Sequence, residues 1–180
     1  MRVAILGAGA VGRASAAYLL TRGHEPVIWS PSGKSAAGLR DGALVVEGEI
    51  SGQFRPAVAD TAEEALNGAD LIMVALPANG HRMVYEQIAR HAAPGQVIVI
   101  SAQPVLGGFA LEERLRAASK SNAVLAWGTT LLRSRQVGAS GVRINTIRKS
   151  LDMAALPGNA EAAFALCRQC ILQSRQQGAS

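Results

Sequence analysis

The stretch RVAILGAGAVGR, residues 2–13, decides the fold of this chain. Residues 3–6 form an uninterrupted aliphatic run, which is typical of a strand that is buried on both faces of a sheet. Glycine ends this run at position 7. The stretch 10–22 that follows has helical composition and ends at Gly23, a natural residue for the end of a helix. The sequence therefore predicts a strand that turns sharply into a helix.

Three glycines occupy that turn with the spacing G-x-G-x-x-G, in the strand–turn–helix context that a dinucleotide-binding turn requires. The first glycine permits the tight turn, the second lets the backbone approach a pyrophosphate, and the third lets the helix pack closely on the strand. The N–H groups and the positive dipole at the helix start favour phosphates. We predict that the cofactor-binding turn consists of Gly7, Ala8, Gly9, Ala10, Val11 and Gly12.

The end of the second predicted strand, residues 25–30, indicates which dinucleotide binds. NAD-binding proteins usually carry an acidic residue there to hold the adenosine ribose. This chain instead has WSPSGKS, so that Ser30, Ser32 and Lys34 provide hydroxyls and a cation. These groups suit a 2′-phosphate and favour NADP, with Arg40 as a second candidate cation. NAD held by backbone contacts remains open.

Strands and helices alternate along the rest of the chain. The stretch 43–59 predicts a hairpin around Gly48 and Gly52, and Thr61 and Glu64 form a Thr-x-x-Glu capping box before a short helix. Further strands are expected at 71–77, 96–101 and 122–127, helices at 79–95, 107–119 and 159–173, and two or three antiparallel strands within 129–157. The pattern predicts an α/β fold with a doubly wound parallel sheet, of Rossmann type, and an antiparallel C-terminal extension.

Ligands of such sheets bind outside the carboxyl ends of the strands. Leu76 and Pro77 lie at the end of the strand expected at 71–77 and are predicted to form a wall of the cofactor cleft. His81 begins the next helix, where a histidine is more often structural than catalytic. Gln103 follows the next strand and points to the same cleft or caps the helix after it, and Thr130 follows the strand after that.

Composition excludes several function classes. The chain has 180 residues, a net charge of +5, and 4% aromatic residues. Its Lys and Arg residues are scattered and lack an aromatic stacking set, which argues against nucleic acid and for anionic small molecules. The apolar runs are far shorter than the roughly 20 residues of a membrane span. We therefore expect small-molecule substrates and no nucleic acid or membrane partner.

The two cysteines, Cys167 and Cys170, fall in a helical pattern with no partner pair. Although C-x-x-C can indicate redox or metal chemistry, we interpret these cysteines as inert thiols and expect no metal site. The N-terminus lacks the pattern of a signal peptide. A cytoplasmic location is expected.

Several later motifs resemble the opine dehydrogenases, the octopine/nopaline dehydrogenase family. They are GADLIMVALPANGH at 68–81, AWGTTLLRSRQVG at 126–138 and ALPGNAEAAF at 155–164. The resemblance implies NAD(P)H-dependent reductive condensation of an amino acid with a 2-oxo acid. It also implies that Gln103 and Thr130 face the substrate cleft, and the position of His81 at the start of the next helix adds this residue to the predicted cleft. Glycerol-3-phosphate dehydrogenase and ketopantoate reductase resemble the first hundred residues.

The chain departs from this family in length, since a full opine dehydrogenase is roughly twice as long. We expect a dinucleotide-binding domain at 1–172 and a polar tail at 173–180, with the helical substrate domain missing. The three histidines, His24, His81 and His91, lie outside that domain, so the catalytic residue is unknown. Two other functions stay open, a non-catalytic dinucleotide-binding module and a reductase of the glycerol-3-phosphate or ketopantoate type. Self-association into a homo-oligomer stays open too.

Overall fold

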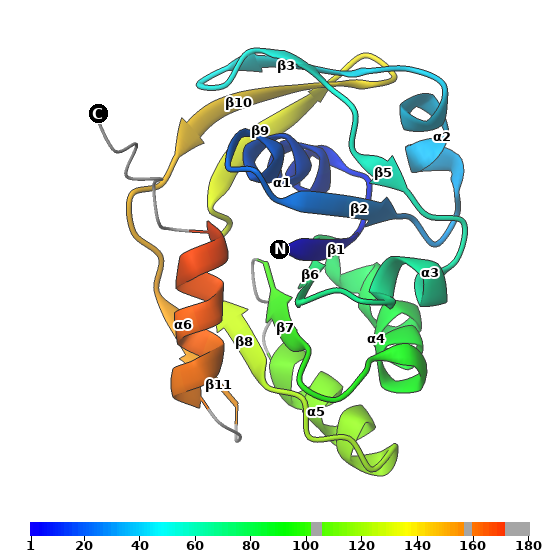
Figure 1. Ribbon diagram of the computed structural model, residues 1–180, viewed down its shortest axis with the longest axis vertical. Helices are drawn as coiled ribbons and strands as arrows, with labels where there is room; N and C mark the ends of the chain where they lie inside the picture. The colour runs from blue at the N-terminus through cyan, green and yellow to red at the C-terminus, as the bar shows by residue number, and fades with distance from the viewer. Residues whose placement is uncertain (102–105, 157–159, 172–180) are drawn as a thin grey trace.

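The computed structural model describes residues 1–101, 106–156 and 160–171. In these parts of the chain the main sheet has seven strands, in the order β11-β8-β7-β6-β1-β2-β5 (Figure 1). All of them run parallel except β11, which pairs antiparallel with β8. The strands are β1 Arg2–Leu6, β2 Glu25–Trp29, β5 Ala57–Val58, β6 Leu71–Val74, β7 Val97–Ile100, β8 Val124–Trp127 and β11 Met153–Ala155. The predicted doubly wound α/β fold is confirmed.

Two apolar cores lie on the two faces of this sheet, because successive side chains of a strand point to opposite faces. On β1, Val3 and Ile5 belong to one core while Ala4 and Leu6 belong to the other. All four side chains are fully buried. This two-sided burial explains why the strands read as continuous aliphatic runs.

Helices cover both faces, as Figure 1 shows. The helices are α1 Ala10–Thr21, α2 Lys34–Arg40, α3 Ala62–Leu66, α4 His81–His91, α5 Gly107–Ala117 and α6 Ala160–Ile171, with a 3₁₀ turn, η1, at Ala78–Gly80. Side chains of α1 and α6 pack into the first core, and those of α3, α4 and α5 pack into the second. Among the described residues, no helix is long and apolar enough to span a bilayer.

A second sheet covers the outer side of α1 (Figure 1). Its order is β4-β3-β10-β9, formed by β3 Leu44–Gly48, β4 Gly52–Phe54, β9 Leu132–Val137 and β10 Gly141–Ile147. Both expected hairpins are present and antiparallel. The extension is not purely antiparallel, however, because β10 joins the earlier hairpin through a parallel pairing with β3.

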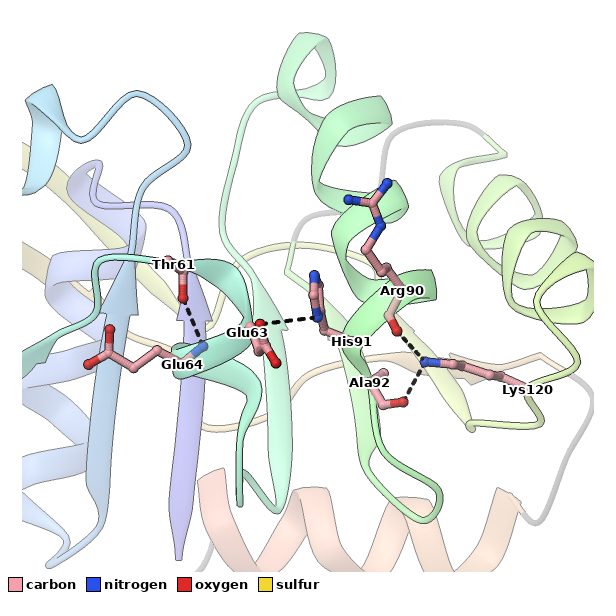
Figure 2. Close-up of polar contacts among 7 residues, drawn as sticks. All are labelled: Thr61, Glu63, Glu64, Arg90, His91, Ala92 and Lys120. Carbon is pink, nitrogen blue, oxygen red and sulfur yellow. Dashed lines mark hydrogen bonds and ion pairs between the residues drawn. The ribbon is translucent and has the colours of Figure 1, made fainter.

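Polar side chains cap the start of α3 and the end of α4 (Figure 2). The Thr61 hydroxyl accepts a hydrogen bond from the Glu64 N–H at 3.1 Å, as the capping box predicts. The Glu64 carboxylate accepts from the Asp60 N–H at 2.9 Å, one residue earlier than in the standard box. At the end of α4, the Lys120 ammonium donates to the carbonyl oxygens of Arg90 and Ala92.

The last helix, α6, packs its apolar face on the first core, where Phe164 and Leu166 stay half-buried. Ala163, Cys167, Cys170 and Ile171 are each at most 2% exposed, and Tyr18 of α1 donates a hydrogen bond to the Ile171 carbonyl at 2.7 Å. Both cysteines are free thiols. Burial raises the pKa of the Cys167 thiol to about 11 and that of Cys170 to about 12, which keeps both protonated at neutral pH.

Candidate functional site

The candidate site lies at the centre of the main sheet, where the strand order reverses. β1 pairs with β2 on one side and with β6 on the other, so chain connections leave this point in opposite directions. Doubly wound sheets bind ligands outside the carboxyl ends of the strands at such a reversal. Gly7 follows β1 at this edge, and Ala75 follows β6.

Two of the three glycines are required by packing within the protein. Gly7 has a φ of 128°, and its N–H donates to the Trp29 carbonyl at 2.8 Å. A Cβ at Gly7 would overlap the Ala75 carbonyl, and one at Gly12 would overlap the Gly7 carbonyl. These two residues therefore allow the turn and the close approach of α1, as the motif predicts.

The middle glycine, Gly9, has a different environment. It is the N-cap residue of α1, with φ −78° and ψ −171°, which any residue can adopt. A Cβ built on Gly9 has no protein atom within 4 Å among the described residues. The protein therefore leaves this space open, although nothing in the backbone requires a glycine there.

The start of α1 beside Gly9 provides hydrogen-bond donors. No side chain caps this end of the helix among the described residues, and its first turn carries no acidic residue. The N–H groups of a first helical turn have no partner within the helix. Ala10 and Val11 are the first residues of that turn and are half-buried. The open space therefore adjoins the positive end of a helix dipole, an arrangement that favours a phosphate.

The loop after β2 provides the next group of predicted contacts. Ser30 is 6% exposed, and its hydroxyl lies 2.8 Å from that of Ser35, whereas Ser32 and Lys34 are exposed. Gly33 closes a turn by donating to the Ser30 carbonyl at 2.9 Å. The second candidate cation, Arg40, is paired with Asp60 at 2.5 Å. Lys34 is therefore the more available cation.

A buried arginine, Arg13, connects this loop to the glycine turn. Its Nε donates to the Ala8 carbonyl at 2.9 Å and one terminal nitrogen donates to the Ser35 carbonyl at 2.9 Å. The residue is 1% exposed, and this burial lowers the pKa of its guanidinium. Sequence analysis missed Arg13. The signal was a single charge within an Ala-rich helix that has almost no polar face.

His81 holds the segment after β6, which is predicted to form a wall of the cofactor cleft. Leu76 is half-buried, and Pro77 is exposed. The His81 ring is 5% exposed, with Nε2 2.9 Å from the Leu76 carbonyl and Nδ1 2.8 Å from the Tyr85 hydroxyl. Nε2 therefore donates and Nδ1 accepts from Tyr85, whose pKa burial raises to about 12. Both ring nitrogens have internal partners, which favours a structural role.

The other predicted cleft residues are less well defined. Thr130 follows β8 at the carboxyl edge and is half-buried, and its carbonyl accepts a hydrogen bond from Arg148 at 3.0 Å. Gln103 lies outside the described residues. Within those residues, no group of three or more His, Cys, Asp or Glu side chains is placed to hold a metal ion.

Two cavities lie next to helix ends. One, of about 660 Å³, lies between α3 and the end of α4 that is remote from the glycine turn. Its lining includes Glu63 and His91, whose Oε2 and Nδ1 atoms lie 4.0 Å apart (Figure 2). The other, of about 290 Å³, lies between the starts of α4 and α5 and is lined by His81, Arg82 and Arg114. The first is remote from the strand ends that bind ligands in this fold.

Comparison with known proteins agrees with this geometry. The model of the ketopantoate reductase PanE/ApbA family matches residues 3–158. An opine dehydrogenase of Arthrobacter sp. (strain 1C) is 29% identical over 169 residues, covering 91% of this chain and 46% of its own length. A glycerol-3-phosphate dehydrogenase [NAD(P)+] of Alcanivorax borkumensis is 35% identical over 102 residues, covering 54% of the chain and 29% of its own length.

Solved structures share the fold at low identity. Octopine dehydrogenase with NADH and pyruvate superposes with a TM-score of 0.75 at 17% identity, covering 87% of this chain and 43% of its own. Yersinopine dehydrogenase with NADP+ superposes with a TM-score of 0.72 at 14% identity, covering 94% of this chain and 46% of its own. The resemblance to opine dehydrogenases is confirmed, and the chain spans less than half the length of each of these four proteins.

Proposed function

Because the chain belongs to the ketopantoate reductase PanE/ApbA family, we propose that residues 1–172 form the dinucleotide-binding domain of an NAD(P)H-dependent oxidoreductase. The activity that we assign is that of an opine dehydrogenase, the reductive condensation of an amino acid with a 2-oxo acid. The extent of similarity supports this choice, since the opine dehydrogenase match covers 91% of the chain and the glycerol-3-phosphate dehydrogenase match 54%.

The open space beside Gly9 is the observation that carries the proposal. In that space, a pyrophosphate would contact the backbone at the start of α1 without meeting a side chain. Helix N–H donors that have no protein partner would then bind the phosphate oxygens. Gly7, Ala8, Gly9, Ala10, Val11 and Gly12 would form this contact, and Leu76 and Pro77 would form the wall opposite.

The cofactor that we propose is NADP. The loop after β2 has no acidic residue before Asp41, whereas Ser30, Ser32 and Lys34 offer hydroxyls and a cation to a 2′-phosphate. Pairing with Asp60 leaves Arg40 less free to contribute, which makes Lys34 the main charge. NADP+ bound to yersinopine dehydrogenase, a protein with the same fold, is compatible with this choice.

The substrate would lie at the carboxyl edge, against the nicotinamide end of the cofactor. When bound, the reduced cofactor would supply a hydride to the carbon of the substrate imine, whose nitrogen takes up a proton. Thr130 and Gln103 are the proposed contacts from this chain. The proposed role of His81 is to hold the Leu76 wall rather than to transfer the proton, since its ring nitrogens already have partners.

The cellular location that we propose is the cytoplasm. The free thiols of Cys167 and Cys170 suit a reducing compartment.

Calorimetric titration of the purified chain with NADPH and with NADH tests cofactor binding. We expect micromolar or tighter binding of NADPH and weaker binding of NADH. NADPH oxidation then distinguishes the reactions, because an opine dehydrogenase requires both an amino acid and a 2-oxo acid. Oxidation with a 2-oxo acid alone would favour the ketopantoate type, and a chain that bound neither dinucleotide would refute the proposal.

A further inference from the structure

Arg13 is a buried charge that the proposed function does not use. It lies in the first turns of α1, directly after Gly12, and is 1% exposed. Its guanidinium reaches three backbone carbonyls from three separate segments: Ala8 and Ser35, both at 2.9 Å, and Gly141 of β10 at 3.5 Å. The side chain therefore links the glycine turn, the loop after β2 and the second sheet.

This link has an unusual charge balance. Among the described residues, no carboxylate lies within ion-pair distance of Arg13, and burial is the one cause of its lowered pKa. Buried charges are normally paired with an opposite charge, because a carbonyl oxygen offsets only part of the lost hydration. An anion placed nearby would therefore stabilise the buried guanidinium of Arg13.

The two segments that Arg13 bridges most tightly are those that the proposed function assigns to the adenosine end of the cofactor. Ala8 belongs to the glycine turn, and Ser35 belongs to the loop with Ser30, Ser32 and Lys34. An anion held between these segments would lie close to the guanidinium, which is itself buried and therefore less screened by water than an exposed charge. The exposed ammonium of Lys34 would approach the same anion from solvent.

We infer that Arg13 is a positioning and specificity residue, which holds the loop of residues 30–35 against the glycine turn and favours a 2′-phosphate on the adenosine ribose. The inference rests on the proposed function and deepens it, because it names the group that distinguishes NADP from NAD at this site. Arg13 touches no reacting atom and acts through the backbone of Ala8 and Ser35 and through its charge.

The test compares R13Q, R13K and R22Q with the unaltered chain. Glutamine at position 13 removes the charge but keeps N–H donors for the carbonyls, and lysine keeps the charge but not the planar fork. R22Q is the matched control, because Arg22 follows the far end of α1, about 13 Å from position 13 along the helix. R13Q and R22Q lower the net charge equally.

Dissociation constants for NADPH and NADH, measured by calorimetry at constant salt, give the ratio of the two affinities. We expect R13Q to weaken NADPH about tenfold and NADH about twofold, since the lost charge acts mainly on the extra phosphate. R13K should weaken both dinucleotides but keep their ratio within about twofold, because the charge remains. R22Q should change neither constant.

Equal loss of NADPH and NADH binding in R13Q, or a lower melting temperature with an unchanged ratio, would overturn the inference and leave Arg13 as a structural brace. If R13Q does not fold, R13K provides the test. A folded R13K that no longer prefers NADPH over NADH would contradict the role of the Arg13 charge. An unaltered chain that binds neither dinucleotide overturns the proposed function and this inference together. Tighter binding of NADH by the unaltered chain refutes only the cofactor choice, provided that R13Q still weakens NADPH selectively.

Discussion

At the scale of single residues, the candidate site combines residues that the fold needs with residues that it does not need. Gly7 and Gly12 are required by contacts within the protein, and His81 has partners for both ring nitrogens. Gly9 and Lys34 have no such constraint, since one adjoins open space and the other is exposed. Substitutions at the second pair therefore report on ligand binding rather than on folding.

Lys34→Glu should reduce the preference for NADPH. A carboxylate at the start of α2 repels a 2′-phosphate, so we expect NADPH binding to weaken about tenfold or more and NADH binding to change little. Lys149→Glu is the matched control, because Lys149 is also exposed and follows the other end of β10 from Gly141. Calorimetric titrations measure both affinities, and an unchanged preference would exclude Lys34 as a 2′-phosphate contact.

His81→Phe should destabilise the fold. The change leaves the Leu76 carbonyl and the Tyr85 hydroxyl without their partner, which costs about 2–3 kcal/mol of unfolding free energy. Tyr85→Phe removes one of these bonds and should cost about 1 kcal/mol. Urea unfolding of both single variants and the double variant measures the coupling, and strictly additive losses would contradict the proposed link.

At the scale of secondary-structure elements, the parallel strands and their helices follow from local sequence. Aliphatic runs bounded by glycine or proline predicted β1, β6 and β7, because strands buried on both faces need apolar side chains at every position. The parallel pairing of β3 with β10 was not predictable. It joins two hairpins far apart in the chain, and neither hairpin carries a local signal for the other.

The candidate site was predictable to a similar degree. Spacing identified the glycine turn, since Gly7 and Gly12 answer local steric demands and Gly9 completes the G-x-G-x-x-G pattern. The roles of Arg13 and His81 depend on carbonyl groups that other segments bring to them, which no sequence pattern records. The pairing of Arg40 with Asp60 likewise required the fold to bring α2 beside the segment before α3.

Helix α6 makes a prediction about alkaline pH. Burial raises the pKa of the Cys167 thiol to about 11 and that of Cys170 to about 12, above the ordinary value of 9.0. The unfolded chain therefore releases these protons first, so stability is complete below pH 9 and falls as pH rises towards 11 and 12. The loss should be on the order of a few kcal/mol.

Urea unfolding at a series of pH values checks this prediction against a Cys167→Ala, Cys170→Ala double variant. The variant should lose less stability than the unaltered chain above pH 9, because it lacks the two thiols. If the unfolding free energy fell equally with pH in the two proteins, the thiols would not titrate with raised pKa values. Thiol reagents should also react slowly with the folded chain at neutral pH.

At the scale of the whole molecule, the two cores lie on the faces of the main sheet, and the candidate site lies at the carboxyl edge of that sheet, where we expect the ligand contacts. The first core packs α1 between the main sheet and the second sheet, which fixes the start of that helix beside the reversal in strand order (Figure 1). The chain spans less than half the length of the opine dehydrogenase and the glycerol-3-phosphate dehydrogenase that it matches, and dinucleotide binding is the property that can be tested on this chain directly.

The most direct test of that central claim is thermal melting of the unaltered chain and of Gly9→Val, with and without NADPH. Since no described residue places an atom within 4 Å of a Cβ at Gly9, and the φ of Gly9 is −78°, valine should leave the melting temperature of the free chain within a few degrees. Ala165→Val, at an exposed position of α6, controls for the added methyl groups.

NADPH at 100 times its dissociation constant should stabilise the unaltered chain by about 2.7 kcal/mol, a rise of about 5–10 °C in melting temperature. Ala165→Val should show the same rise. Gly9→Val should show none, because its side chain would fill the space that the pyrophosphate needs. An equal rise in Gly9→Val, or no rise in the unaltered chain, would contradict the assignment of this turn as a dinucleotide-binding site.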